Sequence, residues 1–168
     1  MMRMLLLAGL LALAGCRGSA DKAGAPDPPK ATSPEQSVVQ TATLTGLYEG
    51  PAGPQLNQMC IIERSSGAAR FGIVVWGTGL TSCSGDGEAV RQGDVLRLTM
   101  SGDEPCRIEA RIEGGRVVLP PQMPAGCAYY CGGGARMAAL QLDKTGGTAA
   151  DAMRAQDLAG DPLCSGAT

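Results

Sequence analysis

The sequence predicts a mainly β domain, an antiparallel meander that forms a small barrel or sandwich, with one short C-terminal helix and disulfides. Three observations predict it. Short apolar segments alternate with polar residues. Gly makes up 25 of 168 residues, which favours many tight turns. The aromatic residues number only five, so the core must be mostly aliphatic.

The strand prediction is clearest at residues 106–112, where apolar and charged residues alternate. Cys106, Ile108, Ala110 and Ile112 share one face of such a strand, and charged residues lie between them. A period of two with one apolar face is typical of a half-buried antiparallel strand. Gly114 and Gly115 supply a two-residue turn, so we expect residues 116–119 to return as the next strand.

The same pattern predicts the other strands of the meander. They are expected at 44–49, 58–64, 70–76, 88–91, 95–100 and 137–142. Residues 84–88 match a calcium loop in composition only, because the alternating ligands of such a loop are missing, so a solvated turn is preferred. Residues 143–147 are also expected to form a turn. Seven or eight short strands result.

A helix is predicted over residues 149–159. Thr148 and Asp151 have the spacing of a capping box, Gly160 stands at the expected end, and Pro162 prevents continuation. Such a helix would pack Ala149, Ala152, Met153 and Ala155 against the sheet or across a barrel mouth.

Six cysteines fall in this domain, and an even number predicts disulfides where a chain reaches an oxidising compartment. They are Cys60, Cys83, Cys106, Cys127, Cys131 and Cys164. No CxxC pair is present and the spacings are long, so a metal site is not expected.

Geometry limits the pairing only in part. Cys127 and Cys131 are too close in sequence to pair outside a tight turn, so each should have its own partner. We expect Cys106–Cys127 across a hairpin and Cys131–Cys164, which leaves Cys60–Cys83. With a strand between them, the Cα atoms of Cys60 and Cys83 would lie about 9.6 Å apart, against a limit of about 7 Å. Either the sheet folds over there or this pairing is wrong.

The N-terminus has the three parts of an export signal: Arg3, an apolar run over residues 5–13, and small residues before Cys16. The run is too short for a stable membrane helix. Leu13-Ala14-Gly15-Cys16 resembles the lipobox of bacterial lipoproteins. That resemblance implies a signal peptide of residues 1–15, cleavage before Cys16, and acyl chains on Cys16. The alternative is an ordinary secretory signal with an incidental cysteine.

The resemblance also implies a location. Arg17 stands where an Asp favours retention at the inner membrane in this class of lipoprotein, so the outer membrane is expected, with the protein on its periplasmic face. Residues 16–43 comprise the lipidated Cys16 and a segment rich in Pro, Ala, Ser and Thr, which is typical of a disordered tether. The folded domain is then residues 44–168, and the membrane is reached through the lipid anchor.

Composition excludes several functions. The chain has no His, so a Ser-His or Cys-His nucleophile and a His-ligated metal are impossible. The formal net charge of −2 argues against a nucleic-acid partner. We therefore expect no catalytic residues, no metal site and no cofactor.

The most unusual stretch is residues 127–134, in which Tyr129 and Tyr130 lie between two cysteines and are followed by three glycines. A loop constrained by disulfides and carrying adjacent tyrosines suits recognition, because Tyr offers contact area at low entropic cost. The alternative is that one Tyr fills the core and the other is incidental.

These observations predict a non-catalytic envelope lipoprotein whose periplasmic β domain binds a protein or cell-wall component. One alternative is a lipid-anchored inhibitor of a wall-degrading enzyme, since small lipid-anchored β-barrel inhibitors of lysozyme have a similar architecture. A second alternative is a carrier of a small apolar ligand inside the barrel.

Overall fold

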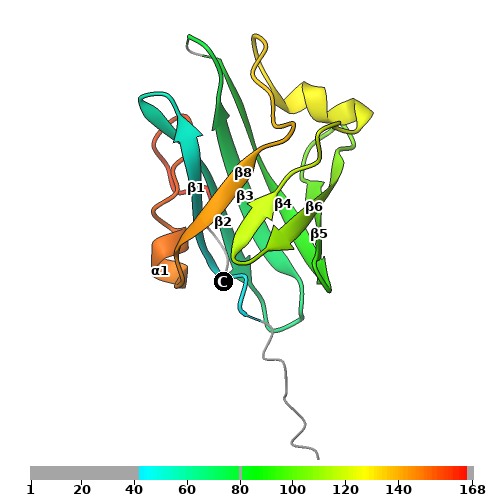
Figure 1. Cartoon of the computed structure of the whole chain (residues 1–168), viewed down its shortest axis with the longest axis vertical. Coiled ribbons are helices and arrows are strands. Elements are labelled where there is room, and N and C mark those ends of the chain that lie inside the picture. Colours follow the sequence, from blue (N-terminus) through cyan, green and yellow to red (C-terminus); the bar gives the residue numbers. More distant parts are fainter. Residues whose placement is uncertain (1–41, 80, 166–168) are drawn as a thin grey trace, which may run out of the picture. The chain divides into compact units, whose positions relative to one another are not determined.

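The computed structural model describes residues 42–79 and 81–165, and these form a closed antiparallel barrel (Figure 1). Each strand pairs with the next in sequence, and the last pairs with the first. The strands are β1 (Gly46–Ala52), β2 (Gln55–Glu63), β3 (Ala69–Trp76), β4 (Ser82–Gln92), β5 (Val95–Met100), β6 (Arg107–Glu113), β7 (Arg116–Val118) and β8 (Gln141–Gly146). The predicted fold class is confirmed, with a barrel rather than a sandwich.

The predictions for the N-terminus lie outside the described residues. They are the signal peptide, the lipobox with Cys16, and all of the tether except residues 42 and 43. Within the described residues, no helix is long and apolar enough to cross a membrane.

Alternation along the strands fills the barrel with aliphatic side chains. In β5, Leu96, Leu98 and Met100 are buried, while Arg97 and Thr99 between them are exposed. The predicted turn at Gly114 and Gly115 is confirmed, with φ of 57° and 90°, a left-handed conformation that glycine adopts without a Cβ clash.

Two predicted turns are wrong, because both segments are strands. Residues 84–88 lie within β4, where a Cβ on Gly87 would come within 2.0 Å of the Thr99 carbonyl oxygen. The glycines there permit close packing of strands instead of a bend. Residues 143–146 belong to β8, where Arg116 of β7 donates to the Asp143 carboxylate at 2.6 Å. Strand β8 accordingly begins at Gln141, and most of the predicted strand 137–142 lies outside it.

The predicted helix is also shorter than expected, since α1 spans only Ala149–Ala152. Its capping box is confirmed: the Thr148 hydroxyl accepts from the Asp151 amide, and the Asp151 carboxylate accepts from the Thr148 amide. Farther on, the Asp157 carboxylate accepts from the backbone amides of Ala159 and Asp161. A side chain that bonds to nearby amides in this way stabilises a turn in place of a helix.

The segment after α1 packs on the outside of the barrel against β1 and β2. Ala152, Ala155 and Cys164 form a small buried cluster there with Leu47 and Cys60, separate from the barrel interior. Of the four residues predicted to pack, Ala152 and Ala155 are buried, whereas Ala149 and Met153 are exposed. A Cβ on Gly72 would come within 2.8 Å of the Leu163 carbonyl oxygen, so this glycine lets the segment lie close to the sheet.

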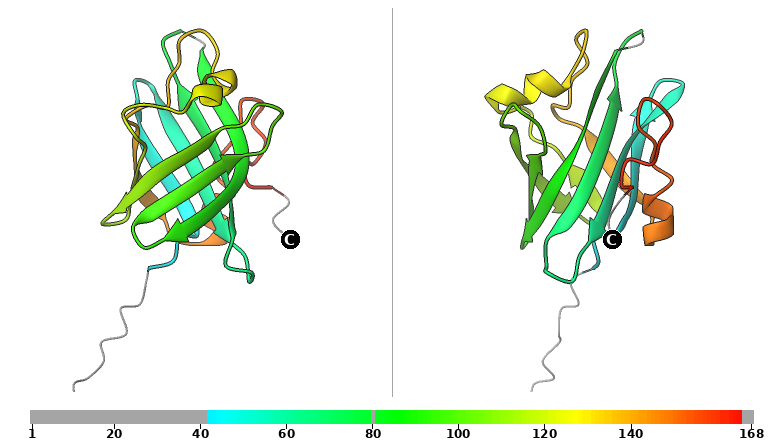
Figure 2. Two further views of the ribbon diagram at one scale, coloured as in Figure 1. Left: turned by 90° about the vertical axis from the view of Figure 1, so that its right-hand side faces the viewer. Right: turned by 180° about the vertical axis from the view of Figure 1, so that it is seen from behind.

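The barrel has two unlike ends (Figure 2). At the first, which we call the tether end, lie residues 42–45, where the described chain begins, and the turns at 64–68, 93–94 and 114–115. At the second, the disulfide end, lie the loop at 101–106 and the long β7–β8 connection, residues 119–140. That connection includes a short 3-10 helix, η1 (Ala125–Tyr130).

Candidate binding site at the disulfide end

Two disulfides hold the β7–β8 connection to the rest of the barrel. Cys106–Cys127 joins it to the start of the β6 hairpin, with Cα atoms 4.7 Å apart, and Cys83–Cys131 joins it to β4, with Cα atoms 3.9 Å apart. The predicted pairing of Cys106 with Cys127 is confirmed, as is the prediction that Cys127 and Cys131 have separate partners.

The other two predicted pairings, Cys60–Cys83 and Cys131–Cys164, are wrong. Cys60 faces the outside of the barrel, whereas Cys83 faces the interior, and β3 lies between their strands. Successive side chains on a strand point to opposite faces, so this difference in orientation prevents a bond. Cys60 pairs with Cys164 instead, because the C-terminal segment returns along the outside of β2.

The helix η1 presents three different faces. Residues three apart in a 3-10 helix lie above one another. Cys127 is buried and Tyr130 is half-buried against the barrel core, whereas Ala125 and Ala128 face a groove. On the remaining face, a Cβ on Gly126 would meet the Pro105 carbonyl oxygen at 2.1 Å, and Tyr129 lies one turn beyond.

Tyr130 fixes η1 onto the barrel. Its hydroxyl donates to the Glu104 carbonyl oxygen at 2.7 Å. A Cβ on Gly102 would lie 2.4 Å from that hydroxyl, and a Cβ on Gly85 would lie 3.2 Å from the ring. Partial desolvation raises the pKa of Tyr130, and Tyr129, Glu104, Asp103 and Asp86 nearby add to the shift. The phenol therefore stays protonated and keeps its donor role.

Tyr129 has a different position, with 65% of its surface exposed. Its ring packs edge to face on Tyr130, with centroids 5.4 Å apart and an interplanar angle of 81°. This contact orients an exposed aromatic ring on a backbone that two disulfides constrain. Of the two tyrosines predicted as a recognition loop, Tyr129 is thus placed for contact and Tyr130 for support.

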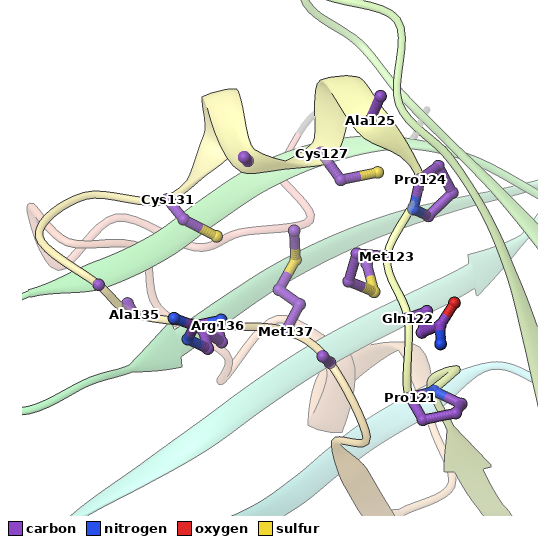
Figure 3. A pocket seen from close by; sticks show the side chains of 13 residues that line it. Pro121, Gln122, Met123, Pro124, Ala125, Cys127, Cys131, Ala135, Arg136 and Met137 are labelled. Carbon is purple, nitrogen blue, oxygen red and sulfur yellow. The ribbon is translucent and has the colours of Figure 1, made fainter.

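An apolar groove of about 560 Å³ opens between the two arms of the β7–β8 connection (Figure 3). Pro121, Met123 and Pro124 come from the first arm, and Ala135, Arg136 and Met137 from the second. Figure 3 shows Met123 and Met137 lying between the arms. The groove is thus lined mainly by carbon and sulfur, with Arg136 and Gln122 as its polar side chains.

This groove was not predicted from the sequence, because Met is an ordinary core-filling residue. Met137 is in fact fully buried, but Met123 is only partly so. One available signal was Pro121 and Pro124 beside Met123, since two prolines so close together indicate an irregular segment whose apolar residues cannot all reach a core.

The tether end is organised by hydrogen bonds instead. The Glu63 carboxylate accepts from the hydroxyls of Thr43 and Thr45 and from the amides of Leu44 and Thr45. Although partial burial opposes the shift, these bonds hold the pKa of Glu63 below its usual value.

Three further side chains secure the same segment. Lys144 Nζ donates to the Thr43 carbonyl oxygen at 2.6 Å, and Arg91 donates to that of Ala42 at 2.8 Å. Burial lowers the pKa of Lys144. Tyr48 donates to the Leu44 carbonyl oxygen, and burial with nearby Glu63 raises the pKa of Tyr48 to about 12.

Comparison with known protein families, with curated proteins and with solved structures finds no match for this chain. Among residues 42–79 and 81–165, no three Cys, Asp or Glu side chains lie close enough together to hold a metal ion.

Proposed function

We propose that this protein is a non-catalytic outer-membrane lipoprotein whose periplasmic barrel binds another envelope component through the β7–β8 connection. The observation that supports this proposal is the exposed Tyr129 on a backbone fixed by Cys106–Cys127 and Cys83–Cys131. A rigid loop loses little entropy on binding, and an exposed Tyr supplies both apolar area and a hydroxyl.

The placement of the two ends supports the same proposal. Residues 42–45 lie at the tether end, opposite the β7–β8 connection. A chain anchored through Cys16 enters the barrel at residue 42, so the disulfide end would be the one free to meet a partner.

Site-specific crosslinking in cells tests the proposal. A photoreactive amino acid replaces Tyr129 in one strain and Met153 in another, because Met153 is also exposed, at 50%, but lies beside α1. We expect a discrete crosslinked species from position 129 and none from position 153. The same species from both positions, or none from position 129, would contradict the proposal.

Inhibition of a wall-degrading enzyme is the second candidate, and the closed small barrel favours it. A lysis assay with lysozyme at micromolar concentrations of the protein tests it under defined salt. Slower lysis by the unaltered protein, restored to the uninhibited rate by Tyr129→Ala, would identify the partner as such an enzyme; unchanged lysis removes the idea.

The carrier hypothesis has less support. An eight-stranded barrel has room either for its own side chains or for one small ligand. Here Met59, Ile73 and Leu96 are wholly excluded from solvent, within a continuous cluster of apolar side chains that occupies the interior.

A further inference from the structure

The groove in the β7–β8 connection has the properties of a small-molecule site, which the proposed function does not use. Its volume, about 560 Å³, lies within the range of about 300 to 1,000 Å³ of small-molecule sites. Such sites are mostly apolar and have a few polar groups that orient the ligand. The groove matches this description, with two prolines and two methionines against one charged side chain.

Arg136 differs from nearly every other arginine in the described residues. Six of them form ion pairs with carboxylates: Arg64, Arg70, Arg97, Arg111, Arg116 and Arg154. Arg91 donates to backbone carbonyl oxygens of Gly93 and Ala42. Arg136 and Arg107 have neither kind of partner within residues 42–79 and 81–165, and of these two only Arg136 lines the groove.

We propose that the groove binds a linear amphiphile with one anionic head, whose apolar chain lies against Pro121, Met123 and Pro124 above the buried Met137, and whose carboxylate pairs with Arg136. Burial of the chain removes exposed carbon and sulfur from water. A guanidinium binds a carboxylate with two parallel hydrogen bonds, and because Arg136 is exposed, the head can stay at the water boundary. A cationic amphiphile of the same length would meet the same walls but would be repelled by Arg136.

The methionines provide reporters for the test. The chain that begins at Arg17, exported without an acylated cysteine, holds five of them: Met59, Met100, Met123, Met137 and Met153. With ¹³C-labelled methyl groups, Met123 and Met137 report on the groove, Met59 and Met100 on the barrel interior, and Met153 on unspecific adsorption to the outer surface.

The probes are sodium decanoate, decyltrimethylammonium and decanol, the first two titrated below their micelle concentrations and decanol below its solubility limit. We expect saturable shifts of the Met123 and Met137 methyl signals with decanoate, and weaker binding of the other two. Arg136→Gln should weaken decanoate binding about five- to tenfold and leave decanol unchanged, since one partly solvated charged pair is lost.

Arg107→Gln is the matched control, because it removes the same charge from the outer face of β6. It should leave decanoate binding unchanged, and the Met59 and Met100 signals should show that both variants fold. Equal binding of decanoate and decyltrimethylammonium, or equal loss in the two variants, would overturn the proposal. So would shifts confined to Met153 or to the interior methionines. Because Tyr129 does not line the groove, Tyr129→Ala should bind decanoate normally, which keeps this test separate from that of the proposed function.

Discussion

The two ends of the barrel are held by different means. At the tether end, the carboxylate of Glu63 and the cations of Lys144 and Arg91 bind the backbone and hydroxyls of residues 42–45. At the disulfide end, covalent bonds secure a connection that leaves Tyr129 and an apolar groove exposed. Exposed apolar groups contribute little to folding, so a loop that presents them must be secured by other bonds. This difference is the reason that we propose the disulfide end as the contact surface.

Removal of a disulfide should give the largest effect. Cys83→Ala with Cys131→Ala opens a link between residues 48 apart in sequence, and we expect a loss of about 3 to 4 kcal/mol in the free energy of unfolding. Hydrogen exchange should speed up across residues 119–140. Cys60→Ala with Cys164→Ala is the control: it should also destabilise, yet leave exchange in that connection unchanged, because its bond lies on the outer wall. Equal acceleration in both variants would show that the disulfides do not act locally.

A smaller loss is expected from Gly126→Ala. Its Cβ would meet the Pro105 carbonyl oxygen, a backbone atom, so η1 must shift away from the 101–106 loop. We expect a loss of about 1 to 3 kcal/mol in chemical denaturation. Gly147→Ala adds the same methyl group where no atom lies within 4 Å, and it should leave stability nearly unchanged. Similar losses from both would mean that close docking of η1 is unimportant.

Substitution of the two tyrosines should distinguish the residue that stabilises η1 from the residue that contacts the partner. Tyr130→Phe removes the bond to the Glu104 carbonyl oxygen and should cost about 1 kcal/mol. Tyr129→Ala should change stability by less than about 0.5 kcal/mol, because its side chain is mostly exposed, while reducing capture of the partner. Thermal and chemical unfolding measure the first effect and crosslinking yield the second. A larger loss of stability from Tyr129→Ala would reassign this ring to the core.

Glu63→Gln should give a small effect, at the opposite end. The folded state holds the pKa of Glu63 below its usual value, so the ionised side chain stabilises the fold above that value. This stabilisation is lost as the pH falls through the lowered pKa. We therefore expect the variant to be less stable at pH 7, by under about 1 kcal/mol because of solvent screening, and to approach the unaltered protein in acid. Unfolding titrations from pH 7 to pH 3 measure this, and a difference that grows in acid would contradict the assigned role.

The sequence predicted the strands best where one face is apolar and the other charged, as in β5 and β6. It failed on two of the three disulfides because β2 is apolar on both faces: Met59, Cys60 and Ile61 are consecutive, so the pattern did not reveal which way Cys60 points. It also extended α1 to residue 159, because the capping pattern did not reveal that the Asp157 carboxylate accepts from the nearby amides of Ala159 and Asp161, which stabilises a turn there instead of a helix.

The candidate site was predicted in part. The unusual spacing of Cys127, Tyr129, Tyr130 and Cys131 indicated the connection that two disulfides hold to the barrel. The sequence could not assign different roles to the two tyrosines. Their roles depend on Gly85 and Gly102, which are distant in sequence and leave space beside them for the Tyr130 ring. The groove could not be predicted for a similar reason, because it forms only where the two arms of the β7–β8 connection lie apart.

Hydrogen exchange in the presence of the crosslinked partner, once purified, tests the division between the ends most directly. We predict protection at residues 125–138 and in the 101–106 loop, with no change at 42–45, 93–94 and 114–115. Protection confined to the tether end would contradict the proposal that the disulfide end is the recognition surface.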